Sequence, residues 1–173
     1  MESYDLVQLS LRVTVGAIMI MHGYNHGWGG GKIPGTAGWF SSLGLKHGKL
    51  QAWASVITEI GAGIMLILGL LTPLAAAATL SIMLVAGLLA HRKNGFFIFK
   101  EGYEYVLALG VVALVLGTFP AGKYSIDNAY DFHAFGLDLF GWTGFWITLG
   151  VGVVATAALL ITTYRPVPTQ PAT

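Results

Sequence analysis

Long runs of apolar residues alternate with short polar connections along most of the chain. Five such runs cover about residues 6–24, 50–71, 73–90, 103–119 and 142–164. A helix needs about 20 mostly apolar residues, with a range of about 17–25, to cross the hydrocarbon core of a bilayer. Each run meets that requirement, so the pattern predicts an all-α polytopic membrane protein with five membrane-spanning helices.

The connections between the runs predict further local structure. The sequence LTP around Thr72 makes so tight a turn that the second and third helices must be antiparallel neighbours, and Pro73 suits the first turn of the third. Residues 36–44, TAGWFSSLG, are amphipathic and predict a short helix at the membrane interface, where tryptophan rings are favoured. Residues 91–105, HRKNGFFIFKEGYEY, combine charges with aromatic rings, and an Asn-Gly pair makes their turn.

Composition agrees with a membrane location and narrows the chemistry. The 173 residues are 55% hydrophobic and 10% charged, whereas about 25% of the residues in a water-soluble domain are charged. The chain has no cysteine, which excludes disulfides, thiolate nucleophiles and cysteine-ligated clusters within it. A net charge of +1 indicates no nucleic-acid partner, and the glycine-rich GWGGGK lacks the spacing of a phosphate-binding loop.

Basic residues predict the orientation of the chain in the membrane. With five spans, the first connection, the third connection and the C-terminus share one side. Seven cations lie in these segments: Lys32, Lys46, Lys49, Arg92, Lys93, Lys100 and Arg165. Because basic loops are typically cytoplasmic, we expect the N-terminus outside and the C-terminus inside. The N-terminus lacks the basic start and the cleavage site of a secretory signal, so the first run is expected to remain as a span.

A few ionisable residues interrupt or border the apolar runs. Arg12 lies in the first run and Glu59 in the second, while His22, His91 and Glu104 lie at run ends on one side of the membrane. A charge near the helix centre costs about 2.5–3.5 kcal/mol on insertion scales. At about 1.5 Å per residue, Arg12 and Glu59 differ by about 6 Å in depth, so we expect them to pair. The pattern predicts a polar pocket to which four helices contribute.

These residues also have simpler structural interpretations, and the sequence leaves both kinds open. Arg12 and Glu59 can act only to hold helices together, and His22 and His91 can be interfacial residues that bond to carbonyls. No metal site is predicted, because the candidate histidines and glutamates form no HxxxH or ExxH pair on one helix. The other histidines are interpreted as loop residues: His26, His47 and His133.

Several short motifs follow one another in a specific order along about residues 10–127. They are HG at residues 22–23, GTAGWFSSLG, a buried Glu59 followed by GAG, LGLLTPLAA, NGFF, GYEY and GKYSID ending at Asp127. This order resembles the DoxX family of small bacterial membrane proteins. The resemblance implies a four-helix membrane bundle linked to redox chemistry. Relatives of the DoxD type belong to a thiosulfate:quinone oxidoreductase, and some DoxX-type proteins associate with a superoxide dismutase and a sulfurtransferase.

The resemblance also suggests how the chain is divided. Residues 1–127 are expected to form the DoxX-like four-helix bundle, and residues 128–141 an acidic surface loop. Residues 142–164 form an additional fifth transmembrane helix, which can dock to another subunit, and residues 165–173 a disordered proline-rich tail. The expected location is the bacterial cytoplasmic (inner) membrane, with the lipid bilayer as one partner.

Two functional hypotheses stay open at this point. In the first, the chain is a redox-linked subunit whose intramembrane pocket binds a quinone or a small sulfur compound, with electrons supplied by other membrane or peripheral redox subunits. In the second, it is a non-catalytic accessory or scaffold subunit of a larger respiratory or oxidoreductase complex. A transporter is a weaker alternative, because no inverted repeat is visible.

The candidate site follows from the same residues, although none is assigned a catalytic role and the sequence leaves open whether the chain is an enzyme. A quinone is the one possible cofactor, and no metal ligands are assigned. The pocket candidates are Arg12, His22, Glu59, His91, Asn94, Tyr103 and Glu104.

Overall fold

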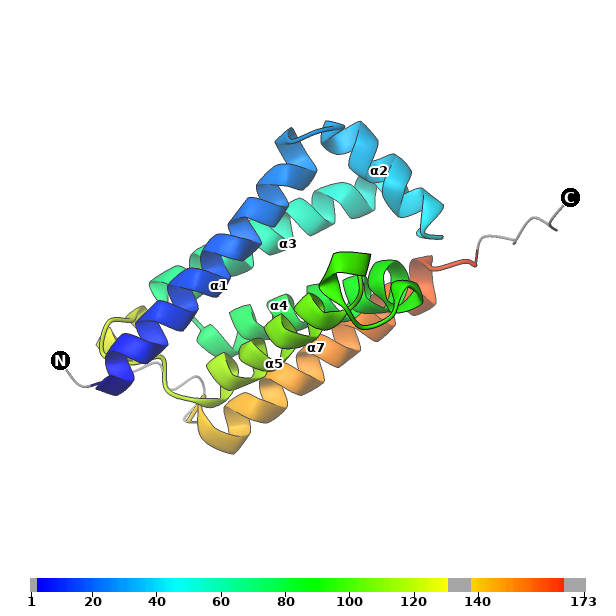
Figure 1. Cartoon of the computed structure of the whole chain (residues 1–173). Coiled ribbons are helices and arrows are strands. Elements are labelled where there is room, and N and C mark those ends of the chain that lie inside the picture. Colours follow the sequence, from blue (N-terminus) through cyan, green and yellow to red (C-terminus); the bar gives the residue numbers. More distant parts are fainter. Residues whose placement is uncertain (1–2, 131–137, 167–173) are drawn as a thin grey trace, which may run out of the picture.

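The computed structural model describes residues 3–130 and 138–166, and every regular element within them is helical. Figure 1 shows the long helices running back and forth along one common direction. In chain order the α-helices are α1 (Ser3–Trp28), α2 (Lys32–Ser42), α3 (Gly48–Leu68), α4 (Thr72–Ala86), α5 (Glu104–Thr118), α6 (Ile126–Ala129) and α7 (Gly141–Thr163).

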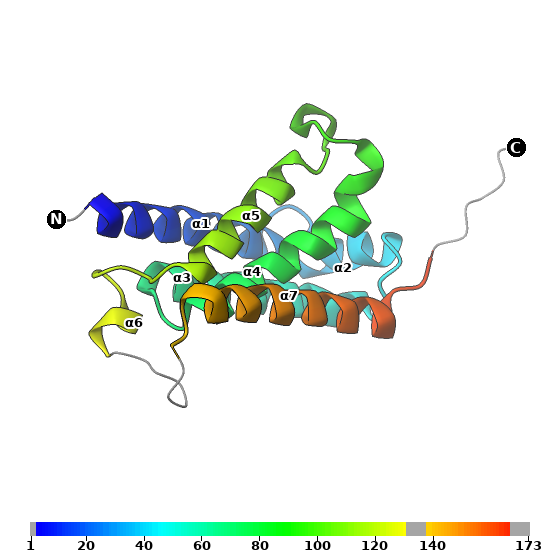
Figure 2. The ribbon, with the colours of Figure 1, turned by 90° about the horizontal axis from the view of Figure 1, so that it is seen from below.

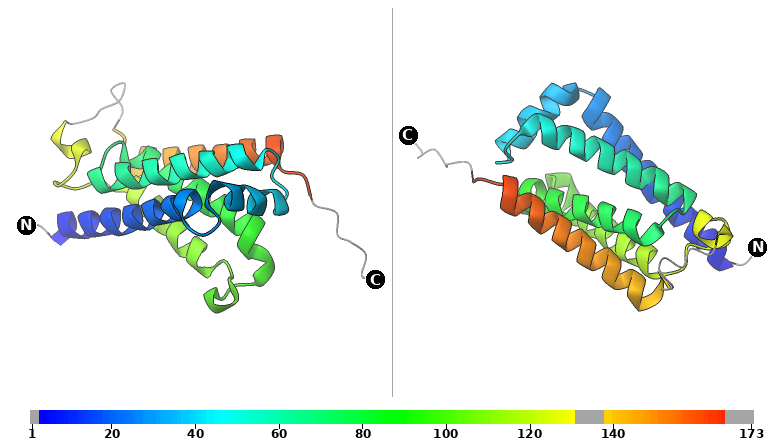
Figure 3. Two further views of the ribbon diagram at one scale, coloured as in Figure 1. Left: turned by 90° about the horizontal axis from the view of Figure 1, so that it is seen from above. Right: turned by 180° about the vertical axis from the view of Figure 1, so that it is seen from behind.

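The long helices form two layers that meet at one end of the bundle. α1 and α2 pack against α3, and α4 packs against both α5 and α7. The short turn between α3 and α4 joins the layers, and Figure 3 shows them diverging toward the end that carries α2. We call the joined end the closed end and the opposite end the α2 end.

The two helices of the first layer approach each other closely at a pair of glycines. A Cβ added to Gly63 on α3 lies only 2.5 Å from the carbonyl oxygen of Gly16 on α1. Any larger residue at either position therefore forces the backbones apart. Small residues are a common means of close helix packing in lipid, where the hydrophobic effect does not drive helices together.

Helix α7 is part of the second layer. The buried Thr148 hydroxyl donates to the carbonyl of Pro73 at 3.1 Å, and the hydroxyls of Thr156 and Ser81 lie 3.1 Å apart. These bonds fix the register of α7 on α4. The sequence pattern treats this helix as an addition to a four-helix bundle, whereas in the structure it contacts both α4 and α5.

The predicted all-α polytopic fold is confirmed. Four helical segments of the described chain are long and apolar enough to cross a membrane: Ser3–Trp28, Gly48–Leu68, Thr72–Asn94 and Gly141–Thr163. The apolar α5 runs in the same bundle but is shorter. The amphipathic segment forms α2, and Pro73 lies in the first turn of α4, both as predicted.

Two helices extend beyond the bounds that the apolar pattern predicts. α1 continues past Tyr24 to Trp28. α4 continues through a π-helical turn, η1 (Gly87–His91), and a 3-10 turn, η2 (Arg92–Asn94). A second 3-10 turn, η3 (Ile98–Lys100), follows before α5, and Figure 2 shows this whole connection projecting to one side of the bundle.

The α2 end collects the connections that carry the seven cations. The segment between α2 and α3 bonds to the end of α7, because the Lys46 amide donates to Thr163 at 2.9 Å and the Arg165 amide donates to Gly44 at 2.8 Å. The rings of His22 and Tyr105, 6.3 Å apart, bring the end of α1 to the start of α5. Five helices of alternating direction thus gather the basic segments at one end.

Candidate functional site

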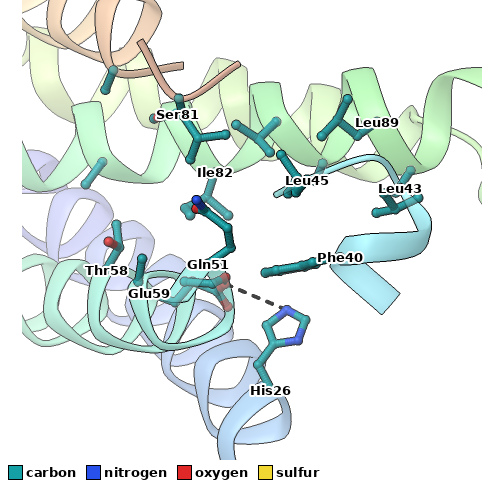
Figure 4. Close-up of a pocket in the computed structure, with 18 of the residues that line it drawn as sticks. His26, Phe40, Leu43, Leu45, Gln51, Thr58, Glu59, Ser81, Ile82 and Leu89 are labelled. Carbon is teal, nitrogen blue, oxygen red and sulfur yellow. Dashed lines mark hydrogen bonds and ion pairs between the residues drawn. The ribbon is translucent and has the colours of Figure 1, made fainter. Parts of the chain in front are cut away.

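A cavity of about 420 Å³ lies between the two layers. Apolar side chains of α4 and α7 form one wall, and the aromatic residues Trp39 and Phe40 of α2 border it at the α2 end. Figure 4 shows polar side chains on the opposite wall, which α1 and α3 supply. The polar lining residues are His26, Gln51, Ser55, Thr58, Glu59 and, across the cavity on α4, Ser81.

Glu59 is the central polar residue of this cavity. Its exposed fraction is only 1%. The Ser55 hydroxyl, one helical turn earlier on α3, donates to Oε1, and the Nε2 of His26 lies 3.7 Å from the same oxygen. The other oxygen, Oε2, is buried and has no hydrogen-bond partner in the described part of the chain. Glu59, a residue that lines the cavity, therefore has one acceptor without a partner in the described chain.

His26 is held in place by α2. Its imidazole ring stacks on Trp39 with 5.9 Å between ring centroids and an interplanar angle of 20°, and Phe40 packs at 5.7 Å. The Thr36 hydroxyl also donates to the His26 carbonyl at 2.8 Å. These contacts explain why the amphipathic helix matters to the site: α2 orients His26, whose imidazole is the one that reaches Glu59 among the described histidines.

The interpretation of His26 as a loop histidine was wrong. His26 lies in the last turn of α1, because the helix continues beyond the apolar run. The sequence contained a signal for this position: His22 and His26 are four residues apart, a spacing that places both on one helix face if the helix extends that far. Only the placement of the helix end at Tyr24 concealed it.

The expected pairing of Arg12 with Glu59 was also wrong. The Arg12 guanidinium donates to the carbonyls of Leu66 and Ile67 at 3.2 and 3.1 Å and to that of Tyr124 at 2.6 Å. Its Nε has no partner among the described residues. Arg12 thus binds two carbonyls in the last turn of α3, where a cation also complements the helix dipole.

Asp127 completes the closed end from the other side of the same turn. Its carboxylate accepts bonds from the backbone amides of Leu71 and Thr72, at 2.6 and 2.8 Å, and from the Thr72 hydroxyl at 2.6 Å. The carboxylate therefore caps the start of α4, although it lies more than fifty residues away in sequence. Arg12 and Asp127 together satisfy the turn that joins the two layers.

The remaining candidates lie at the rim of the α2 end and none of them lines the cavity. His22 is exposed and its ring stacks on Tyr105. The Nδ1 of His91 lies 2.7 Å from the Glu101 carbonyl, and the Asn94 amide donates to the same oxygen at 3.2 Å. Both side chains therefore brace the connection between α4 and α5.

Glu104 and Tyr103 also have structural contacts in this connection. A Glu104 oxygen accepts the Ile98 amide at 3.0 Å, and the Tyr103 ring packs edge-on against Phe96 at 5.5 Å. Glu101 precedes α5 and has a φ of 59°, so it is part of the connection and not of the helix. Many of the polar residues in HRKNGFFIFKEGYEY thus fold the connection itself, and a ligand role for them stays a prediction.

These features define a small integral membrane protein of the all-α polytopic class, with a cavity between its two layers. The DoxX family model matches residues 7–92, from α1 to the end of α4 and its π turn. The chain belongs to the DoxX family. His26, Glu59 and Arg12 lie inside the matched region, whereas Asp127, α5 and α7 lie beyond it. No curated protein and no solved structure matches the chain.

Proposed function

We propose that the protein is a redox-linked membrane subunit whose cavity binds a quinone. The observation that carries this proposal is the buried Oε2 of Glu59, which has no partner in the described chain and belongs to a residue that lines the cavity. A buried polar atom without a partner destabilises a fold by about 1–3 kcal/mol. A ligand hydroxyl that donates to Oε2 removes this penalty.

The size and lining of the cavity suit such a ligand. Small-molecule pockets typically measure about 300–1,000 Å³ and are mostly apolar with a few polar groups, and this cavity of about 420 Å³ has that character. The polar wall on α1 and α3 suits the headgroup of a quinone. The apolar wall on α4 and α7 suits its hydrocarbon tail.

The polar wall matches both redox forms of the headgroup. A quinone presents carbonyl oxygens, which accept hydrogen bonds from the His26 ring or the Gln51 amide. A quinol presents hydroxyl groups, which donate to Glu59. The aromatic rings of Trp39 and Phe40 border the same space and offer flat surfaces for a ring to pack on.

An anionic sulfur compound fits this cavity less well than a quinone. The lining includes no lysine or arginine, and it includes the carboxylate of Glu59. An anion brought next to a buried carboxylate is repelled, and the low dielectric of the site strengthens that repulsion. Arg12, the buried cation, is bound to carbonyls at the closed end.

In this proposal, partner subunits supply or remove the electrons, because the chain has no cysteine for thiol or cluster chemistry. The protein lies in the bacterial inner membrane with its α2 end in the cytoplasm, as the seven cations at that end favour. The cavity then opens toward the cytoplasmic half of the bilayer, where a quinone can enter from lipid.

The direct test is quinone binding by the full chain purified in mild detergent. A short-chain ubiquinone analogue is titrated while tryptophan fluorescence is recorded, and a Trp39→Phe variant assigns the quenched signal. We expect Glu59→Met to weaken binding at least about tenfold, because a hydrogen bond to a charged group contributes about 1.5–3 kcal/mol. Extraction of the wild-type preparation identifies any quinone that co-purifies.

The matched control is Glu104→Met, which makes the same chemical change at the rim. We expect it to bind the analogue as tightly as the wild type. Equal binding by the Glu59 variant contradicts the proposal. The accessory-subunit alternative predicts a different outcome: no quinone co-purifies, and the Glu59 change lowers the yield of assembled complex instead.

A further inference from the structure

A second cavity of about 520 Å³ lies on the opposite side of α4, between α4, α5 and α7. We call it the α4–α5 groove. Nearly all of its lining is aliphatic, and several lining residues are about half exposed, including Leu107 at 50% and Val111 at 52%. In a membrane protein such a surface faces lipid.

The polar groups of the α4–α5 groove lie at one end of it. Among the described residues that line it, only Arg92 is charged and only Tyr103 has a hydroxyl, and both belong to the connection at the α2 end. Within the described chain, neither the Arg92 guanidinium nor the Tyr103 hydroxyl has a hydrogen-bond or ion-pair partner. Two free donors at the mouth of an aliphatic groove match an anionic, phosphate-bearing headgroup above a hydrocarbon chain.

The length of the groove matches one leaflet of a bilayer. Along α5 and the residue before it, the groove lining runs from Tyr103 to Leu114. At a rise of about 1.5 Å per residue this distance is about 16 Å. The hydrocarbon core of a bilayer is about 30 Å thick, so the groove covers about half of it. One acyl chain, with its headgroup at Arg92, has this extent.

We propose that the α4–α5 groove binds an anionic phospholipid, with the acyl chain against α5 and the phosphate on Arg92 and Tyr103. Charge complementarity selects this occupant, since the headgroup end of the groove has the Arg92 guanidinium in its lining. Basic residues near a membrane surface attract anionic lipids. The proposal is independent of Glu59 and of quinone binding.

Lipid retention by the full chain tests this proposal. The protein is exchanged into mild detergent with phosphatidylglycerol or phosphatidylcholine, and bound lipid is counted by native mass spectrometry. We expect preferential retention of phosphatidylglycerol, reduced about fivefold by Arg92→Gln, since in this proposal the Arg92 guanidinium donates directly to the lipid phosphate. The matched control is Lys93→Gln, which removes the same charge from a neighbouring residue outside the groove lining and is expected to keep the preference.

A second variant tests the groove itself. Leu107→Trp fills it from a half-exposed position, so we expect lost lipid retention with unchanged thermal unfolding. Equal loss in the Arg92 and Lys93 variants overturns the proposal, as does equal retention of both lipids. If inorganic phosphate alone stabilises the protein as much as phosphatidylglycerol does, Arg92 and Tyr103 bind a soluble anion instead. That result also overturns the proposal. A dimer that Leu107→Trp dissociates assigns the groove to a second copy instead.

Discussion

Arg12 and Glu59 are both ionisable residues buried in an apolar bundle, yet their surroundings differ. Arg12 is 0% exposed and Glu59 is 1% exposed. Arg12 donates three hydrogen bonds to backbone carbonyls at the closed end. Glu59 accepts one bond from Ser55, has His26 nearby, and keeps one oxygen free beside a cavity.

This difference shows that burial alone does not separate structural from functional charges. Burying a charge is expensive in either case, and a fold retains it when the charge satisfies other groups or when a ligand does so. Arg12 bonds to two carbonyls in the last turn of α3 and to the carbonyl of Tyr124. Glu59 satisfies no backbone group in the described chain, so its retention points to an interaction outside the fold.

The largest loss of stability is expected when the Arg12 side chain is replaced. We expect Arg12→Met to lower the free energy of unfolding by about 3–5 kcal/mol, because removing one partner of a buried charged network leaves the others unsatisfied. The measurement is reversible unfolding in mixed micelles with sodium dodecyl sulfate, followed by circular dichroism.

Arg12→Lys is the control that keeps the positive charge but removes the planar guanidinium. A lysine ammonium is a single point charge and cannot bridge carbonyls from α3 and from Tyr124 as a planar guanidinium does, so an intermediate loss is expected. A loss below about 1 kcal/mol for Arg12→Met is the size typical of exposed ion pairs. That result contradicts the structural role assigned to Arg12.

The second test removes the carboxylate on the other side of the same turn. Asp127 is 5% exposed and accepts three bonds. Asp127→Ala is expected to cost about 1–3 kcal/mol of unfolding free energy, since it leaves two helix-start amides and a hydroxyl without an acceptor. Thr72→Val deletes only the hydroxyl and should cost less, in the same unfolding measurement. Equal losses of unfolding free energy in the two variants would mean that the bond to the Thr72 hydroxyl, and not the bonds to the two backbone amides, accounts for the effect.

Much of the fold was predictable because hydropathy reports membrane spans directly. Each apolar run became a helix of the bundle, and the LTP turn and α2 appeared where the sequence indicated them. In lipid, every backbone polar group must be satisfied within the helix, so apolar length alone fixes the secondary structure.

The partners of buried charges were not predictable in the same way. Depth along the membrane follows from residue count, but the direction in which a side chain points depends on helix rotation and packing. Arg12 lies at a depth from which Glu59 is within reach, yet it points toward the α3–α4 turn. Asp127 acts on that turn from a distant loop, which no spacing rule reveals. His26 was missed because α1 gains one more turn than its apolar run.

A smaller effect is expected at the rim, where the sequence placed several site candidates. Glu104 accepts the Ile98 amide in a water-accessible connection. Glu104→Gln keeps an acceptor there, so the expected change in unfolding free energy is at most about 0.5–1 kcal/mol. A loss as large as that of the Asp127 variant would contradict this expectation. It would mean that the connection between α4 and α5 stabilises the fold as strongly as the closed end does.

The smallest change in stability is expected at Glu59 itself. This result separates the role of Glu59 from that of Arg12 most clearly. Replacing a buried, partly unsatisfied polar group by an apolar one of similar size is often neutral or stabilising. Glu59→Met should therefore unfold within about 1 kcal/mol of the wild type, or above it. Ser55 loses its acceptor, but a helical serine can donate to the carbonyl four residues earlier instead.

The same unfolding titration used for Arg12 decides between the two roles. If Glu59 holds helices together as Arg12 does, the Met variant loses several kcal/mol and the cavity is a packing defect. If the carboxylate serves a ligand, stability is kept while quinone binding is lost. A residue that reduces stability and is needed for binding is the expected signature of a functional site, because selection for function opposes the apolar substitution that folding alone favours.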